Sequence, residues 1–272
     1  MKIEWMLKQD PVLLAFIFTT FAYLMTALGA AVVFCFRNVS QRWMNAMLGF
    51  AAGIMIAASF WSLLAPAIER AQGGRLPAYL VVTLGFGAGA LFLAGCDGAM
   101  AKVRALRNRP ANRSERVRRT FLLVFAITLH NIPEGLAVGV AFGALAGAGA
   151  MDGQMLSAMA VAMGIALQNL PEGAAVSTPL RREGMSRIKC FFIGQMSGLV
   201  EPIFGVLGAV LVIWAKPVLP YALSFAAGAM IYVVAEELLP EAQSGRSAAG
   251  RLGSLGCVVG FALMMALDVG LG

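Results

Sequence analysis

The 272-residue chain is 60% hydrophobic and only 13% charged, and its mean hydropathy is +0.80. A soluble domain carries about a quarter charged residues, so this composition excludes an ordinary soluble globular protein. The net charge of +7 is concentrated in a basic segment, residues 102–119, that contains no aromatic residue and adjoins an apolar stretch. We therefore interpret the basic segment as a topology signal in contact with anionic lipids, and not as a nucleic-acid-binding surface.

Apolar stretches of about 20 residues recur along the chain, and each is long enough to cross the ~30 Å hydrocarbon core as a helix. They predict an all-α polytopic membrane protein with eight transmembrane helices in a single domain, residues 1–272. The expected spans are 11–36, 43–66, 77–96, 120–147, 155–180, 189–214, 218–240 and 252–271. Helices 1–3 thus occupy 11–96, a basic loop 97–119, helices 4 and 5 120–180, and helices 6–8 189–271.

The first predicted span is longer than the apolar core of a signal peptide and is followed by no small-residue cleavage site, so we expect a retained helix. Most of the 21 Lys and Arg residues fall on the side that contains the 97–119 loop. The positive-inside rule places this side in the cytoplasm and, with an even number of spans, both termini outside. We expect a multi-pass protein of a plasma membrane, most simply a bacterial inner membrane.

Two internal repeats relate different spans. Residues 130–135 (His-Asn-Ile-Pro-Glu-Gly) resemble 168–173 (Gln-Asn-Leu-Pro-Glu-Gly), and residues 50–56 (Phe-Ala-Ala-Gly-Ile-Met-Ile) match 225–231 (Phe-Ala-Ala-Gly-Ala-Met-Ile). The two spans of each pair lie an odd number of crossings apart, so they run in opposite directions. The chain therefore shows the pattern of a 3+2+3 inverted-repeat arrangement, which recurs in alternating-access carriers.

Ionisable side chains occur inside the predicted spans, where they are costly and usually functional. His130, the only histidine, lies one helical turn before Glu134, so both face the same side of span 4. Gln168 and Glu172 repeat this spacing on span 5, and Glu201 adds a third carboxylate in span 6. The antiparallel spans thus predict a shared cluster of nitrogen and oxygen donors within the bilayer.

Amide and proline residues accompany the charged ones. Asn131 and Asn169 border the two faces, and each motif contains a proline, Pro133 or Pro171, that is expected to bend its helix and free a carbonyl. Three carboxylates in a low dielectric repel one another, and a divalent cation removes that penalty. Imidazole with carboxylates suits Zn²⁺, Fe²⁺ or Mn²⁺ better than Ca²⁺ or Mg²⁺. The alternative is a hydrogen-bonded network that only joins helices or relays protons.

With these motifs the whole chain resembles the ZIP (Zrt/Irt-like) divalent metal transporter family, especially its GufA-type bacterial branch. The resemblance implies transport of zinc, and also of cadmium, iron or manganese, toward the cytoplasm by elevator-type alternating access. The metal is then the transported substrate, and no catalytic cofactor or enzyme activity is expected. The partners implied are metal ions, the lipid bilayer and a second copy of the chain in a homodimer.

The resemblance also implies a binuclear midplane centre. Its first site would use Met55, His130, Glu134, Gln168 and Glu172. Its second would use Asn131, Glu134, Asn169, Glu172 and Glu201, and Asn169 stands where some relatives carry Asp, which should weaken the second ion. At the cytoplasmic end of span 7, Glu236 and Glu237, with Glu241 nearby, fit either an exit relay or a solvated helix end.

Two other functions are compatible with buried acids. An intramembrane metalloenzyme of the site-2-protease type needs a pair of histidines, and this chain has one. A proton-coupled carrier of an organic solute would use the same carboxylates without a metal. Metal binding that depends on His130 distinguishes a metal carrier from the second alternative.

Overall fold

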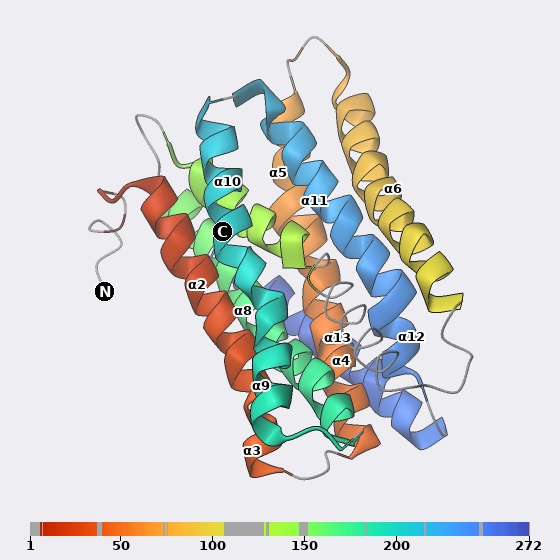
Figure 1. The fold of residues 1–272 in the computed structure, drawn as a ribbon. Helices are drawn as coiled ribbons and strands as arrows, with labels where there is room; N and C mark the ends of the chain where they lie inside the picture. The colour runs from red at the N-terminus through yellow and green to blue at the C-terminus, as the bar shows by residue number, and fades with distance from the viewer. Residues whose placement is uncertain are drawn as a thin grey trace.

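The chain is helical throughout the part that the computed structural model describes, in agreement with an all-α polytopic protein (Figure 1). The described residues are 6, 8–36, 40–72, 74, 76–105, 128, 131–146, 152–182, 184–214, 216–244 and 247–271. His130 and residues 106–127, which include most of the basic segment, lie outside this set. The expectations for them remain predictions.

Two groups of helices make up the structure. The first group, called here the site bundle, contains α2 (Pro11–Ala30) with its short extension α3 (Val32–Cys35), the helical residues 131–143 and α8 (Asp152–Arg182). It also contains α9 (Arg187–Met196), which continues through a 3₁₀ turn, Ser197–Leu199, into α10 (Val200–Trp214). Asp10 caps α2, its Oδ1 accepting from the Val12 amide at 2.7 Å.

The second group, called here the scaffold, contains two long composite helices and two simple ones. α4 (Gln41–Ala58) passes through a π-helical segment, Ser59–Leu64, into α5 (Ala65–Ala71). α11 (Leu219–Val233) passes in the same way through Val234–Leu238 into α12 (Leu239–Ala242). α6 (Ala78–Ala105) and α13 (Ser247–Leu271) complete the group. A 3₁₀ turn, Lys216–Val218, leads into α11.

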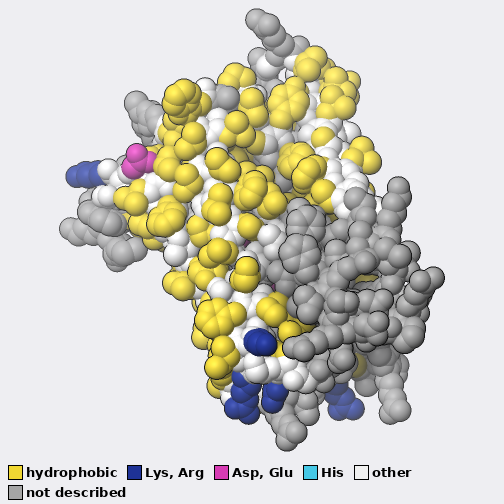
Figure 2. Space-filling model, in the orientation of Figure 1, with side chains coloured by type: hydrophobic (Ala, Val, Ile, Leu, Met, Phe, Trp, Pro, Cys, Tyr) yellow, Lys and Arg dark blue, Asp and Glu magenta, His cyan; other side chains and the backbone are white. Residues whose placement is uncertain are grey.

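Six helices of the described part are long and apolar enough to cross a membrane, and these are Pro11–Cys35, Gln41–Ala71, Ala78–Cys96, Arg187–Trp214, Leu219–Ala242 and Ala249–Gly270. α8 is also long enough, at 31 residues. Its polar residues lower its mean hydropathy, as expected for a helix that carries a buried site. Figure 2 shows hydrophobic side chains over much of the visible described surface, with most of the visible Lys and Arg at its lower end.

Helix α6 is longer than the predicted third span. It continues to Ala105, so residues 97–105, expected in the basic loop, are helical. Ala, Met, Lys and Arg, which dominate this stretch, are strong helix formers, and no glycine or proline follows Gly98 within it. The predicted span ended at residue 96, where the apolar residues end. The helix continues to Ala105 because the polar residues that follow also have high helix propensity.

The two π-helical segments were not expected from the sequence. In each, the residue that follows donates its amide to the carbonyl five positions earlier, Ala65 to Phe60 and Leu239 to Val234. A proline comes directly after, at Pro66 and Pro240, and proline cannot donate to the carbonyl four residues before it. A wider turn before each proline is a local response to that missing donor.

Glycines allow the helices of the scaffold to approach backbone to backbone. A Cβ atom at Gly53 of α4 would collide with the carbonyl of Cys257 in α13, and one at Gly228 of α11 would collide with the carbonyl of Phe86 in α6. Membrane helices usually associate through close contact of small residues, because the hydrophobic effect does not drive helices together within lipid. The scaffold is therefore held by van der Waals packing of bare backbone.

Substitution of Gly53 tests this packing. Gly53→Val should lower the thermal unfolding temperature of the purified chain in detergent, because overpacking of this kind costs about 1–3 kcal/mol. Gly95→Val is the matched control, since Gly95 is exposed and a Cβ there meets nothing within 4 Å. Equal unfolding temperatures for the two variants, measured by circular dichroism, would contradict the assignment of this crossing.

Candidate metal centre

The polar residues of the two repeated motifs come together inside the site bundle. Asn131 and Glu134 lie on the 131–143 helix, one turn apart, and Gln168, Asn169 and Glu172 lie on α8. All but Glu172, which is half-buried, are at most 2% exposed. The structure thus brings together the described members of both motifs, as the antiparallel repeat predicts.

Glycines again set the distance between the helices. A Cβ on Gly135 would lie 2.6 Å from the carbonyl oxygen of Glu201 in α10, and one on Gly173 would collide with the carbonyl of Thr26 in α2. Each glycine follows the glutamate of its motif, so the same Pro-Glu-Gly sequence presents a carboxylate and lets a neighbouring helix approach next to it. The two motifs therefore occupy equivalent positions, one against α10 and one against α2.

Hydrogen bonds divide the cluster into two parts. In the first part, the Gln168 amide donates to Glu134 Oε1 at 2.6 Å. In the second, the Asn169 amide donates to both carboxylate oxygens of Glu201, at 2.8 Å each, and the Asn131 amide donates to Glu201 Oε1 at 3.3 Å. Glu201 itself is fully buried, at the first turn of α10 directly after the 3₁₀ turn.

Several buried oxygens of the cluster accept no hydrogen bond within the described part of the chain: Asn131 Oδ1, Glu134 Oε2, Gln168 Oε1 and Asn169 Oδ1. Leaving such a group without a partner costs about 1–3 kcal/mol, so native proteins rarely do it without a reason. All of these atoms are acceptors, and a cation satisfies acceptors. A network that served only to join helices would instead have matched the carboxylate oxygen Glu134 Oε2 with a donor.

A cavity of about 160 Å³ opens onto the first part of the cluster. Its wall includes Glu134, Gln168 and Glu172 of the site bundle and Met55 of α4, so a thioether of the scaffold lines the same cavity as the oxygen ligands. The cavity continues along Leu48, Ala51, Ala175, Val176, Val233 and Leu238 to Glu237 and Glu241. This is the end of the molecule where α4 and α9 begin, called here the basic end because exposed Arg42, Arg187, Lys189 and Arg251 lie there.

The two proposed relay residues occupy different positions. Glu237 lines the cavity, whereas Glu236 is exposed and does not appear among the described residues of its wall. Glu241, one turn beyond Glu237, lines the mouth of the cavity as well. The cavity thus has acidic side chains at the buried cluster and again at Glu237 and Glu241, with apolar side chains also in its wall.

Sequence reasoning missed one participant, Thr26 of α2, whose hydroxyl donates to Glu201 Oε1 at 3.5 Å. A threonine in an apolar helix carries no signal of its own, and only the packing of α2 against α8 places it here. Among described residues no group of three or more His, Cys, Asp or Glu side chains is close enough to hold a metal ion. The described donors are therefore carboxylates supplemented by amide oxygens and Met55, with His130 outside the described set.

Comparisons with known proteins agree with this chemistry. A family model described as "ZIP Zinc transporter" matches residues 104–268. Zinc transporter ZIP11 of Bos taurus is 39% identical over 342 aligned residues, covering 97% of this chain and 99% of that protein. Zinc transporter GufA of Myxococcus xanthus is 36% identical over 250 residues, covering 91% and 94%. Zinc transporter ZIPB of Bordetella bronchiseptica is 37% identical over 250 residues, covering 91% and 78%.

Met55 provides a test of the first part of the cluster. A thioether prefers softer metals, so Met55→Leu, which conserves volume, should lower cadmium binding more than zinc binding, shifting the ratio of the two affinities by about threefold or more. Metal binding to the purified chain, followed by isothermal titration with each ion, measures this ratio. An unchanged ratio would assign Met55 to packing alone. Met163→Leu, at an exposed position of α8, is the matched control.

Proposed function

The chain belongs to the ZIP zinc transporter family, and from this premise we propose that it carries zinc toward the cytoplasm through the buried cluster of Glu134, Gln168 and Glu172. The family consists of transporters, so zinc is the substrate and the protein is not an enzyme. The observation that carries the proposed site is the pair of buried oxygens Glu134 Oε2 and Gln168 Oε1, which accept no hydrogen bond from the described residues and belong to side chains that line an open cavity. His130 stays a predicted further ligand.

The donor set supports a transition-metal ion of moderate affinity. Two carboxylates compensate the double charge, an amide oxygen and a thioether add neutral ligands, and no described ligand is a thiolate. Cd²⁺, Fe²⁺ and Mn²⁺ share these preferences to different degrees, and we include them in the proposed substrates. Binding of this kind is strong enough to dehydrate the ion and weak enough to release it.

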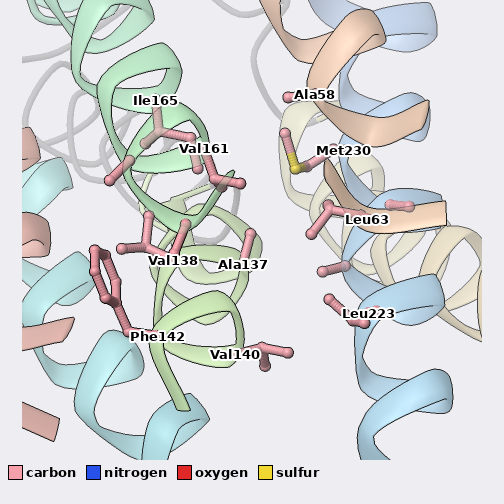
Figure 3. Packing of buried hydrophobic residues seen from close by; sticks show 14 of the residues in the cluster. Ala58, Leu63, Ala137, Val138, Val140, Phe142, Val161, Ile165, Leu223 and Met230 are labelled. Carbon is pink, nitrogen blue, oxygen red and sulfur yellow. The ribbon is translucent and has the colours of Figure 1, made fainter. Parts of the chain in front are cut away.

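The cavity supports an inward-open state. It reaches the cluster from the basic end, which the positive-inside rule assigns to the cytoplasm. Toward the opposite end the path is closed by apolar side chains, where Ala137 and Val140 of the site bundle face Leu63 and Leu223 of the scaffold (Figure 3). Beyond this layer a second cavity, of about 630 Å³, is lined by Ser62, Asp268 and Glu69 among others. Access from the two sides therefore has to alternate.

Equivalent contacts support an eight-helix inverted repeat. α4 packs mainly on α13 and α11 mainly on α6, the pairings that exchange when spans 2 and 3 are superposed on spans 7 and 8. The π-helical segments after α4 and α11 fall at matching positions of the repeat. Gly135 against α10 and Gly173 against α2 relate the two motif helices in the same way. The scaffold and the site bundle are the two bodies that we propose move in an elevator-type exchange; a homodimer stays a prediction.

Uptake of zinc into metal-free liposomes tests the site. The double variant Glu134→Ala/Glu172→Ala should abolish zinc uptake, because it removes both carboxylates that compensate the ion. Gln72→Ala, at an exposed position after α5, is the control and should retain uptake at equal reconstituted protein. Normal uptake by the double variant would refute the assignment. Competition by cadmium, iron and manganese in the same vesicles measures selectivity.

The direction of opening has a separate test. In a variant whose native cysteines are replaced, Glu241→Cys at the cavity mouth should react with a membrane-impermeant thiol reagent only from the cytoplasmic side. Glu69→Cys, exposed at the opposite end, should react only from outside. Labelling of right-side-out and inside-out vesicles gives the answer. The reverse pattern would invert the proposed orientation of the chain.

A further inference from the structure

Glu201 has a different environment from the carboxylates beside the cavity. Donors from three helices converge on it: the Asn169 amide of α8 at 2.8 Å from each oxygen, the Asn131 amide of the 131–143 helix at 3.3 Å and the Thr26 hydroxyl of α2 at 3.5 Å. Glu201 itself belongs to α10, so one carboxylate joins all four principal helices of the site bundle. Asn169 also donates to the carbonyl of Ala22, at 3.2 Å, which ties α8 to α2 a second time.

The cavity does not reach this part of the cluster. Glu134, Gln168 and Glu172 are among the residues of its wall, whereas Glu201, Asn169 and Asn131, all of them described, are not. Glu201, Asn169 and Asn131 are each 0% exposed. An ion that enters from the basic end therefore meets the first part of the cluster before it meets Glu201.

The chemistry of the two parts also favours a metal ion at the first part and not at the second. A metal ion needs lone pairs directed at it. In the first part Glu134 Oε2 offers an unpaired carboxylate oxygen next to Gln168 Oε1, whereas in the second part the unpaired acceptors are the neutral amide oxygens Asn131 Oδ1 and Asn169 Oδ1. Both oxygens of Glu201 instead face N–H and O–H groups, whose positive ends stabilise an ionised carboxylate and would repel a cation at the same place. A carboxylate that accepts several hydrogen bonds has its charge compensated without a metal.

We propose that this transporter carries one divalent ion at a time, held at the first part of the cluster, and that Glu201 is a positioning residue that acts through Asn169. The tie made by Glu201 with Asn169, Asn131 and Thr26 fixes α2, the 131–143 helix, α8 and α10 as one rigid body. Because Asn169 directly follows Gln168 in the chain, the hydrogen bonds from Asn169 to Glu201 also fix the orientation of α8 and of its ligands Gln168 and Glu172. This inference rests on the proposed function of the Glu134 site and replaces the second ion of the binuclear expectation.

Metal stoichiometry tests the proposal directly. The full chain, purified in detergent and equilibrated by dialysis with Zn²⁺, should bind one ion per chain by elemental analysis. Asn169→Asp should raise the number to two, because it removes the donor amide and supplies an anionic ligand beside Glu201. Glu201→Gln should leave it at one. Two ions on the unaltered chain, reduced to one by Glu201→Gln, would overturn the proposal while leaving the proposed function intact.

If the Glu134→Ala variant still bound zinc, or if the unaltered chain bound none, both the proposed site and this inference would be overturned.

Transport kinetics in liposomes provide a second measurement, in which loss of a ligand and loss of a positioning residue have different effects. Glu201→Gln should lower Vmax about tenfold and change KM less than about twofold, since Glu201 does not touch the ion. A KM raised about tenfold at constant Vmax would instead indicate that Glu201 binds the ion, and would contradict its proposed role as a positioning residue.

Thr26 offers a variant that touches no predicted ligand. Thr26→Val removes one donor to Glu201 and should lower Vmax with the stoichiometry unchanged, and Thr26→Ser, which keeps the hydroxyl, should restore the rate. Failure of Thr26→Ser to restore it would indicate that the hydrogen bond to Glu201 is not what Thr26 contributes, and would count against the tie.

Discussion

A carboxylate inside a bilayer has to be compensated, and the whole site bundle is arranged around that requirement. Three glutamates lie where water does not reach freely, and each must find either a cation or a set of donors. The structure provides both solutions side by side. Glu134 keeps an oxygen available beside a cavity, whereas both oxygens of Glu201 accept from Asn169. Under the proposed function, Glu134 serves transport and Glu201 serves rigidity, although both are buried glutamates.

The buried carboxylates find partners only because the helices lie close enough together for short side chains to make contact. Glycine is the residue that allows this, at Gly135 and Gly173 in the site bundle and at Gly53 and Gly228 in the scaffold. The contacts between the two groups are of another kind, since α8 meets α4 and α13 through buried apolar side chains such as Ile165 and Met264. Backbone contact within each group and side-chain contact between them fit two bodies that stay intact while their interface changes.

The proposed inverted repeat would give these features a common origin in geometry. Each of the two similar motifs lies on its own helix and packs against its own neighbour, one against α10 and one against α2. The symmetry is not complete at the level of chemistry. The 131–143 helix faces α10, which carries Glu201, whereas α8 faces α2, which offers Thr26 at the corresponding contact. The cluster therefore has a second part in which Glu201 is hydrogen-bonded and a first part, with Glu134, that lines the cavity.

The sequence by itself determined the membrane class and most of the described helices, and it predicted the residue types of the proposed site, because apolar length and a duplicated Pro-Glu-Gly motif are local properties. Residues that act only through packing gave no such signal. Thr26 is an ordinary threonine until α2 meets α10, and the π-helical segments depend on prolines whose effect on a buried helix varies with context. Which carboxylate faces a cavity and which faces donors was likewise decided by the tertiary structure, since a glutamate in a sequence does not indicate what lies opposite it.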